Sequence, residues 1–369
     1  MAGEPSDTEI ADDLLQYLRG ELGSADLAYV TAPVRLSGGN ETLIFAFALD
    51  RAPEAFSGPL ILRAFRAGYV RPDQARWEAT VQNAVAAQGY PAPRALLTCP
   101  SRAVLGTPFL IMEHLPGTML LQGTGELDAA GQMRFQRHQT ILRARLLLRD
   151  LPRICAEAQI RLHTLDPEPL LEAFQREGLP LTSVTFDGRL EALRNRIDGD
   201  ELGGLREAFS WVIDRQPQNE RLAICHGDIQ PNNILLTGRA ITGVVDWSQA
   251  VVAGPAYDVG FTKMAFDTVP LRVPGFLGWA ARPAVRRMGS RYMASYRRHL
   301  PIDLDAVRYY GVFRGIFVLA FIGGRRLAGT REPDVWDSPD GIAALISYVR
   351  SATGTAISLP PETRPAFAT

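Results

Sequence analysis

The chain has 369 residues, of which 46% are hydrophobic and 21% are charged, and its formal net charge at pH 7 is −1. This composition is typical of a soluble globular protein, long enough for two domains or for one unit with two lobes. A net charge so close to zero argues against a dedicated nucleic-acid binder, which would carry a marked basic excess.

Targeting and membrane signals are not evident in the sequence. Residues 1–7 are acidic and lack the apolar segment of a secretory signal. The longest apolar run, 315–324, is shorter than a bilayer span. Three scattered cysteines, Cys99, Cys155 and Cys225, make neither a disulfide framework nor a zinc spacing. We therefore expect a cytoplasmic protein, a monomer or homodimer, with no membrane or nucleic-acid partner.

The N-terminal part predicts a helix followed by a hairpin. Residues 8–22 carry apolar side chains at the helical period, and the strand-like segments 28–36 and 42–49 flank a polar turn. A glycine pair at such a tip lets backbone N–H groups approach a phosphate, although an ordinary turn is the commoner explanation of such a pattern alone. The turn contains Ser37, Gly38, Gly39 and Asn40.

A third strand, 59–65, carries one charged residue, Arg63, in an apolar setting. A helix predicted over 71–87 follows it and carries Glu78 on its first turns. An internal ion pair between Arg63 and Glu78 is one interpretation of this pattern. The alternative is a surface arginine on an edge strand and a solvated glutamate.

Two further strands, 95–99 and 108–113, complete the strand-rich part of the sequence, and helical patterns dominate after Pro116. We therefore predict an α+β chain with an N-terminal domain over 1–116 and a helical C-terminal domain over 117–358. The proline-rich residues 359–369 are predicted to form a flexible tail.

The helical part begins with two predicted helices, 127–151 and 151–165, that meet at Leu151. The second ends near His163, which we interpret as a core histidine bonded to backbone rather than a catalytic group. Further helices are predicted over 169–174, 189–197 and 205–213 and through most of 274–350.

The segment from Cys225 to Leu236, followed by Val244-Val245-Asp246-Trp247, carries the strongest chemical signal. Asp228 and Asn233 lie on a polar loop that enters an apolar strand, and a turn leads to a second apolar strand that ends at Asp246. A hairpin would bring Asn233 and Asp246 near each other, and such oxygen donors suit Mg²⁺. Asp228 lies just before them, where a carboxylate could accept the proton of a hydroxyl.

This spacing resembles the catalytic loop and metal aspartate of protein kinases, with Gly227 in place of an arginine. It is more similar to the aminoglycoside phosphotransferase and choline kinase family, whose loop reads His-Gly-Asp, then Pro, then Asn, and later Asp-Trp. The resemblance covers about residues 28–350, with specific motifs only between 225 and 258. It implies a protein-kinase-like bilobal fold with a small antiparallel-sheet N-lobe, a larger helical C-lobe, ATP or GTP as co-substrate, and Mg²⁺.

The same resemblance implies a role for each matching residue. Asp228 would be the catalytic base, and Asn233 and Asp246 would hold the metal. The predicted nucleotide-binding residues are Ser37, Gly38, Gly39, Asn40, Arg63, Glu78, Met112, Glu113 and His114, the last three through a backbone contact with adenine. The predicted supporting residues are His226 and Asp258, with Asp258 bracing the catalytic loop. Two departures from the family pattern, Ser248 and Gly254, weaken any idea of an additional acidic ligand.

We therefore predict a small-molecule kinase whose partners are a nucleotide and a small hydroxylated acceptor. A catalytically silent nucleotide-binding module is one alternative, although the intact Asp228 argues against it. A protein kinase is another, but nothing after Asp246 resembles its Phe-Gly or activation segment.

Charge gives one expectation about the acceptor. Lys263 is the only lysine, and the segment from Arg282 to Arg298 carries six arginines and no acidic residue. If this segment faces the acceptor, a neutral or anionic molecule such as a hydroxyacyl-CoA, a sugar or a macrolide-like polyol is favoured over a polycationic aminoglycoside. An aminoglycoside-type antibiotic kinase stays an alternative, because a solvated basic helix explains the arginines equally well.

Overall fold

The computed structural model describes residues 6–36, 42–66, 73–120, 125–127, 133–135, 140–199, 202–270, 278–330 and 335–362. The chain forms two compact units, which we call unit 1 and unit 2. Unit 1 combines Met1–Gly117 with two later segments, Glu168–Pro180 and Leu235–Ser248, and unit 2 contains the rest. The end of the first segment lies one residue after the predicted boundary at 116, whereas the two later segments fall within the predicted C-terminal domain.

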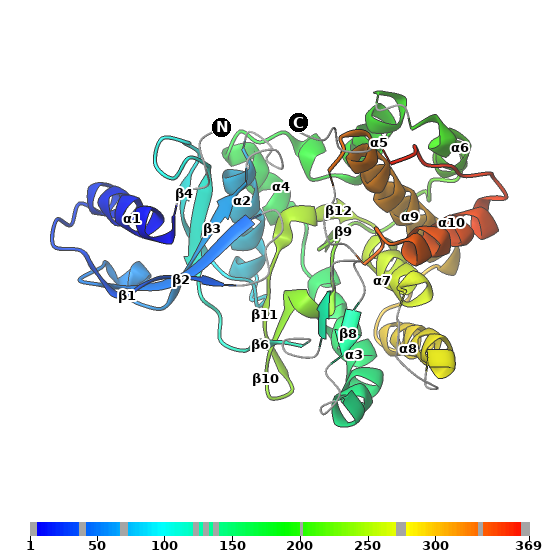
Figure 1. Ribbon diagram of the computed structural model, residues 1–369, viewed down its shortest axis with the longest axis horizontal. Helices are drawn as coiled ribbons and strands as arrows, with labels where there is room; N and C mark the ends of the chain where they lie inside the picture. Colours follow the sequence, from blue (N-terminus) through cyan, green and yellow to red (C-terminus); the bar gives the residue numbers. More distant parts are fainter. Residues whose placement is uncertain are drawn as a thin grey trace, which may run out of the picture. The chain divides into compact units, whose positions relative to one another are not determined.

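Unit 1 is built on a five-stranded antiparallel sheet with the strand order β1-β2-β3-β5-β4 (Figure 1). Its elements are α1 (Asp7–Glu21), β1 (Ala28–Leu36), β2 (Thr42–Asp50), the 3₁₀ turn Glu54–Phe56, β3 (Leu60–Phe65), α2 (Gln74–Ala87), β4 (Ala95–Cys99), β5 (Phe109–Glu113), α4 (Glu168–Arg176), most of β10 (Ile234–Thr237) and β11 (Ala240–Val244). The predicted strands of this region are confirmed.

Alternation along β3 decides what its two faces contact, because successive strand side chains point to opposite sides. Leu62 belongs to the apolar cluster shared with α1. Ile61 and Phe65 belong to the opposite cluster, together with Ala75 of α2. Arg63 shares the parity of Ile61 and Phe65, so the charge on this strand points towards α2.

The two later segments are attached to unit 1 by specific packing. Phe174 of α4 meets Trp77 of α2 edge-to-face, with ring centroids 5.8 Å apart. The hairpin of β10 and β11 is held by a hydrogen bond from Val244 N to Pro91 O at 2.7 Å. Aromatic packing and a backbone hydrogen bond of this kind explain why both segments join unit 1 despite their distance in sequence.

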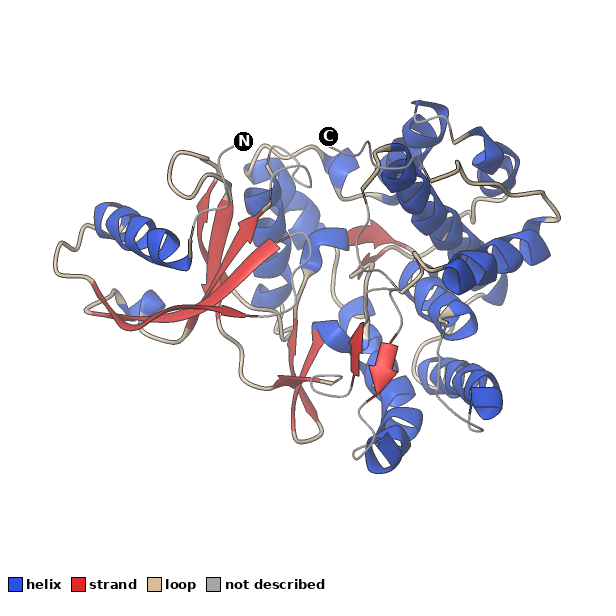
Figure 2. Cartoon of the chain, in the orientation of Figure 1, coloured by secondary structure: helices blue, strands red, loops and turns tan. Residues whose placement is uncertain are grey.

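Unit 2 is mainly helical (Figure 2). Helix α9 packs against α5, α6, α7 and α10, and α3 packs against α8. The elements of unit 2 are β6 (Thr118–Met119), β7 (Gly125–Leu127), β8 (Met133–Phe135), α3 (Thr140–His163), the 3₁₀ turns Leu181–Ser183, Gly203–Leu205 and Pro231–Asn233, α5 (Phe186–Gly199), α6 (Arg206–Asp214), β9 (Ala223–Cys225), β12 (Val251–Ala253), α7 (Ala256–Thr268), α8 (Gly278–Arg297), α9 (Leu304–Leu327) and α10 (Pro339–Thr353). A further turn, Trp247–Gln249, lies at the boundary of the units.

Helix α9 passes length and composition criteria for a membrane-spanning helix, the one such case among the described residues. In the structure, 78% of its most apolar window is buried inside the protein. Its apolar surface is therefore used in packing against the neighbouring helices of unit 2.

The segment from 127 to 165 differs from the prediction of two helices. Strands β7 and β8 form an antiparallel pair, and one helix, α3, then continues through Pro152. Pro152 has no N–H to donate to the carbonyl four residues before it, which is that of Leu148. Arg291 of α8 donates its Nη1 to Leu148 O at 3.1 Å. The helix continues because tertiary packing supplies the hydrogen bond that proline removes.

Candidate functional site

The loop with Asp228 leaves a short antiparallel pair in unit 2, in which Cys225 of β9 faces Val251 of β12. Gly227 adopts φ +79°, a conformation that favours glycine. A Cβ atom on Gly227 would lie 2.0 Å from the carbonyl oxygen of Gln249. Both the backbone conformation and the close approach therefore require glycine at this position.

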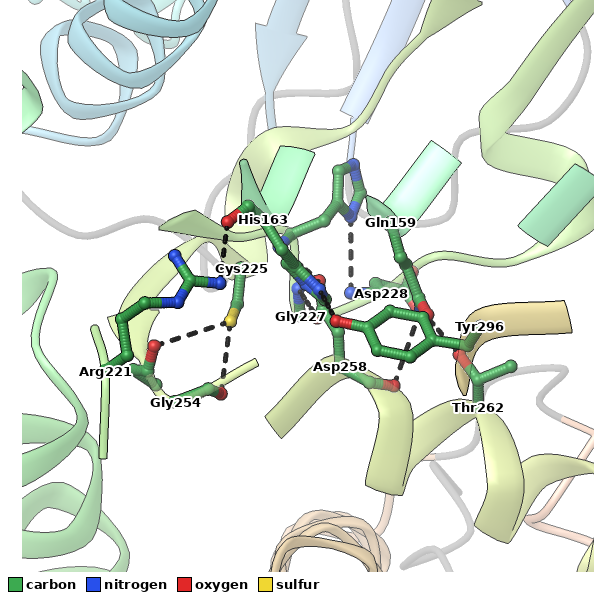
Figure 3. Close-up of polar contacts among 12 residues, drawn as sticks. Gln159, His163, Arg221, Cys225, Gly227, Asp228, Gly254, Asp258, Thr262 and Tyr296 are labelled. Atoms are coloured by element: carbon green, nitrogen blue, oxygen red, sulfur yellow. Dashed lines mark hydrogen bonds and ion pairs between the residues drawn. The ribbon is translucent and has the colours of Figure 1, made fainter. Parts of the chain in front are cut away.

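Asp258, on the first turn of α7, fixes this loop from below (Figure 3). Its carboxylate is fully buried and accepts the backbone N–H of His226 at 2.8 Å and of Gly227 at 2.7 Å. His163 Nε2 lies 3.2 Å from the same carboxylate. Burial raises the pKa of Asp258, but the hydrogen bond and charge of His163 and the charge of His226 outweigh it, so the pKa lies below its ordinary value. The lowered pKa favours the carboxylate form, which accepts two backbone N–H groups of the loop.

His163 itself is held by side chains and not by backbone, which corrects our expectation. Its Nδ1 lies 2.8 Å from the Tyr296 hydroxyl of α8. Beside it, Gln159 donates to Thr262 Oγ1 at 2.8 Å and contacts Tyr292. Side chains from helices α3 and α8 thus together hold Asp258 in position beneath the loop (Figure 3).

Asp228 is half-buried and its carboxylate is held by two amides. Gln230 Nε2 donates to Oδ2 at 2.9 Å, and Asn233 Nδ2 donates to the same oxygen at 3.0 Å. Asn233 Nδ2 also donates to the Asp228 carbonyl at 2.9 Å, and its side chain is buried. With the nitrogen of the Asn233 amide committed to Asp228, the acceptor atom Oδ1 is the one suited to a hard cation. Gln230 was not among the predicted site residues.

In unit 1, Arg63 bridges two carboxylates. Its guanidinium lies 3.1 Å from Glu78 Oε1 and 2.9 Å from Asp246 Oδ1. The side chains of Arg63 and Glu78 are buried, whereas that of Asp246 is 36% exposed. The structure therefore brings together three of the predicted residues, and Arg63 and Glu78 are not the surface arginine and solvated glutamate of the alternative interpretation.

Glu78 is fully buried in this group, and burial raises its pKa to about 7. The positive charge of Arg63 acts in the opposite direction, whereas the negative charge of Asp246 reinforces the rise. Oε2 of Glu78 has no hydrogen-bond partner among the described residues. The ion pair with Arg63 is therefore sensitive to pH near neutrality.

Asp246 adopts φ +64°, a left-handed conformation that is uncommon for residues other than glycine and asparagine. Ser248 Oγ donates to Asp246 Oδ1 at 2.9 Å. The departure at Ser248 thus places a hydroxyl donor beside the aspartate instead of a second acid. Strained backbone of this kind is concentrated at functional sites, where surrounding contacts maintain it.

Among the remaining predicted nucleotide-binding residues, the structure describes residues 112–114 but not residues 37–40. Met112 and Glu113 end β5, where Glu113 N donates to Arg94 O at 3.0 Å. His114 N donates to Pro59 O at 3.0 Å. An adenine edge at this segment would therefore have to meet other backbone groups. The predicted phosphate loop, residues 37–40, lies outside the described residues.

Two further features of unit 2, a buried cluster around Asp258 and the glycine at 254, lie close to the loop before Asp228. His163, Cys225 and Asp258 form the one cluster with metal-ligand spacing among the described residues, but each is engaged in hydrogen bonds, and burial raises the pKa of the Cys225 thiol. We interpret this cluster as part of the hydrogen-bonded group that holds the loop before Asp228, and not as a metal site. The departure at Gly254 makes room for Glu220, because a Cβ atom at 254 would lie 2.2 Å from Glu220 Oε1.

Comparison with known proteins gives relatives of two kinds, acyl-CoA dehydrogenase family members and aminoglycoside phosphotransferases. Acyl-CoA dehydrogenase family member 10 of Mus musculus is 22% identical over 329 residues, which are 85% of this chain and 28% of that protein. The chain thus spans less than a third of that relative. An aminoglycoside 3'-phosphotransferase of Streptomyces ribosidificus is 27% identical over 159 residues, which are 38% of this chain and 55% of that one.

Solved structures show the same fold. A chain from Ralstonia eutropha assigned to the aminoglycoside phosphotransferases superposes with a TM-score of 0.61 at 18% identity, covering 94% of this chain and 99% of that one. Aminoglycoside phosphotransferase APH(4)-Ia, in a complex with ADP and hygromycin B, gives 0.55 at 16% identity, with coverages of 93% and 98%. These similarities confirm the predicted kinase-like fold and the predicted resemblance. The model of the phosphotransferase enzyme family (APH) matches residues 34–288, more than half of the chain. The chain therefore belongs to this family.

Proposed function

We propose that this chain transfers the γ-phosphoryl group of ATP, or of GTP, to a hydroxyl group of a small molecule. The observation that best supports this is the half-buried Asp228, whose carboxylate is held by Asn233 and Gln230. Its loop is fixed by the buried Asp258 anion. A carboxylate so positioned suits a base in a family of phosphotransferases.

In the proposed reaction, the acceptor oxygen forms a bond to the γ-phosphorus while the bond from that phosphorus to the β–γ bridging oxygen breaks. The acceptor proton passes to the Asp228 carboxylate, and the products are a phosphate ester and the nucleoside diphosphate. The chain contributes position and charge, not a covalent intermediate. Asp228 is aligned for this by its two amide contacts.

Asn233 and Asp246 are the proposed ligands of Mg²⁺. The Oδ1 of Asn233 and the partly exposed carboxylate of Asp246 are hard oxygen donors of the kind that this ion prefers. When bound, Mg²⁺ would neutralise charge on the nucleotide phosphates. The chain runs directly from Asn233 into β10 and from β11 to Asp246, so one hairpin links the two ligands.

Arg63 is the proposed phosphate-binding residue, oriented by Glu78. A guanidinium provides five N–H donors in a planar fork, so it can hold a carboxylate and a phosphate at once. We further propose that residues 37–40 cover the phosphates and that the backbone of residues 112–114 contacts the base. These assignments rest on the family resemblance and on the position of Arg63 in unit 1.

The metal assignment is tested by thermal unfolding with and without Mg-ATP. We expect Mg-ATP to stabilise the parent protein and to have little effect on Asp246→Asn, because asparagine tolerates the left-handed backbone but carries no charge. Asp50→Asn, which removes an exposed carboxylate of unit 1, should keep the full shift. An undiminished shift in Asp246→Asn would remove Asp246 from the metal site.

The acceptor is proposed to be neutral or anionic, with an aminoglycoside-type antibiotic kinase and a silent nucleotide-binding module as alternatives. The test is ATP consumption over a panel of hydroxylated compounds that contains kanamycin-like amines, neutral polyols and anionic alcohols. Turnover of a neutral or anionic alcohol supports the proposal. Turnover of polyamines alone would favour the antibiotic kinase, and nucleotide binding without any turnover would favour the silent module.

A further inference from the structure

A groove between α3 and α8 in unit 2 is lined by four arginines. Arg149 and Arg153 come from α3, and Arg291 and Arg298 come from α8 and the residue after it. No acidic residue is among the described residues that line this groove. The sequence of α8 also contains no acid. The surface is therefore locally basic in a protein whose net charge is −1.

Three of these arginines are held by short contacts. Arg153 pairs with Glu157 at 2.9 Å, Arg291 donates to Leu148 O at 3.1 Å, and Arg298 donates to Ser295 Oγ at 3.2 Å. Each contact uses only part of a guanidinium that has five N–H donors. The side chains are thus preoriented, which lowers the conformational cost of binding a further acceptor group.

The volume of the groove and its apolar lining residues indicate a compact, small-molecule ligand. Its volume is about 720 Å³, which lies in the range of small-molecule sites. Leu148, Pro152 and Ala294 supply apolar surface between the charges. A concave site of this volume fits a compact molecule better than an extended polymer or a flat membrane.

The two helices that form the groove also carry the residues that hold Asp258, which in turn fixes the loop before Asp228. On the same two helices, Tyr292 contacts Gln159, and Tyr296 contacts His163, which lies against Asp258. Ten residues separate Arg153 from His163, a rise of about 15 Å along a helix. A ligand that spans α3 and α8 would therefore contact the two helices that support the loop.

We propose that the α3–α8 groove is a binding site for a small molecule with two or more phosphate or carboxylate groups. Paired arginines on facing helices give such a ligand several charge-assisted hydrogen bonds, whereas a monoanion would use only one side. This binding does not require the phosphotransfer reaction, so it can be measured separately.

The experiment is calorimetric titration of the full chain with inorganic tripolyphosphate and with orthophosphate in a buffer that contains EDTA. We expect tripolyphosphate to bind more tightly than orthophosphate. In Arg149→Gln/Arg298→Gln its affinity should fall by about tenfold or more, because each variant side chain loses a charged hydrogen bond. This variant spares Arg291, which bonds Leu148 O of the helix that contains Pro152, and Arg153, which pairs with Glu157.

A matched control removes the same charge from another face of α8. Arg291 and Arg298 lie about 20° apart around the helix axis, whereas Arg286 and Arg297 lie about 120–140° from Arg291. Both control residues are exposed and outside the groove. Arg286→Gln/Arg297→Gln should keep the parent affinity, and amide hydrogen exchange should show protection by tripolyphosphate in 148–153 and 291–298.

Three results would overturn the proposal. These are equal loss of affinity in the two double variants, unchanged affinity in the groove variant, or parent protein that binds phosphatidylserine vesicles but not tripolyphosphate. The first would show a general charge effect, the second a site elsewhere, and the third a membrane surface. None of them would affect the proposed phosphotransfer, which depends on Asp228.

Discussion

Gly227, in the loop before Asp228, lies where an added Cβ atom would overlap a neighbouring backbone. Gly227 and Gly238 both have positive φ, at +79° and +61°. Only a Cβ atom at 227 would meet a neighbour, the carbonyl of Gln249 at 2.0 Å, whereas nothing lies within 4 Å of one at 238. The backbone strain of alanine is therefore shared, and the steric clash is specific to Gly227.

We predict that Gly227→Ala lowers the free energy of unfolding by at least about 2 kcal/mol more than Gly238→Ala, because the loop must shift to relieve the overlap. Urea unfolding of both variants measures this difference. Phosphotransfer should also fall in Gly227→Ala alone. Equal destabilisation would show that the loop can move away from Gln249 at little cost.

Glu78 is the residue whose ionisation should be visible in stability. Its pKa of about 7 in the folded protein exceeds its ordinary value of 4.5. Between these values the folded protein holds a proton that the unfolded chain has released, so stability is greatest below the ordinary value and falls as pH rises towards 7. The loss is on the order of 3 kcal/mol, and it should level off above pH 7.

The measurement is the free energy of unfolding at about pH 5 and about pH 8 in the parent and in Glu78→Gln, which cannot titrate. The decline with pH should be smaller in the variant. Glu113→Gln, which changes a carboxylate of the same unit, serves as the control. Identical pH dependence in the parent and Glu78→Gln would contradict the raised pKa of Glu78.

The sequence indicated the candidate site residues more readily than it indicated the residues that support them through hydrogen bonds. The resemblance to a known family pointed to Asp228, Asn233, Asp246 and Asp258 because they lie in a short motif. Tyr296 gave no such signal, because it lies 133 residues after His163, and only the folded chain brings them together. Local sequence patterns carry no information on such contacts.

At the scale of elements, strand-like runs between turns predicted the strands of unit 1, and the alternation of side chains along β3 explains why Arg63 meets α2. The region around Pro152 was not predictable in the same way. Proline normally ends or kinks a helix, yet α3 continues because Arg291 on another element bonds the exposed carbonyl of Leu148. Tertiary contacts here override the local signal.

This explanation of α3 predicts coupling between Arg291 and Pro152. Arg291→Met should destabilise the protein by about 1 kcal/mol, because Leu148 O loses its donor. In Pro152→Ala the backbone N–H can bond that carbonyl, so the further cost of Arg291→Met should shrink. A double-mutant cycle by urea unfolding measures the difference. Strictly additive effects would show that Arg291 does not compensate for the proline.

At the scale of the whole molecule, segments of the two compact units alternate along the chain. The first segment of unit 1 ends at Gly117, one residue after the predicted boundary, and residues 168–180 and 235–248 also belong to this unit. Those segments join unit 1 through contacts such as the edge-to-face packing of Tyr90 with Trp247 at 5.6 Å. A boundary drawn along the sequence assumes contiguous domains and cannot show this.

The proposed function draws on residues that belong to both units. Asp228, Asn233 and Asp258 belong to unit 2, whereas Arg63, Glu78 and Asp246 belong to unit 1. The hairpin of β10 and β11 provides the covalent connection between the proposed base and metal ligands.

The most direct test of the proposed phosphotransfer is Asp228→Asn, measured for nucleotide binding and for turnover in the same preparation. Asparagine keeps the size of the side chain but cannot accept a proton, so the Kd for Mg-ATP should stay close to the parent value while kcat falls by a factor on the order of 10² or more. Asp214→Asn, at an exposed position of unit 2, should leave both unchanged. Parent-like turnover in Asp228→Asn, or equal loss of binding and turnover, would contradict the role of Asp228 as the base.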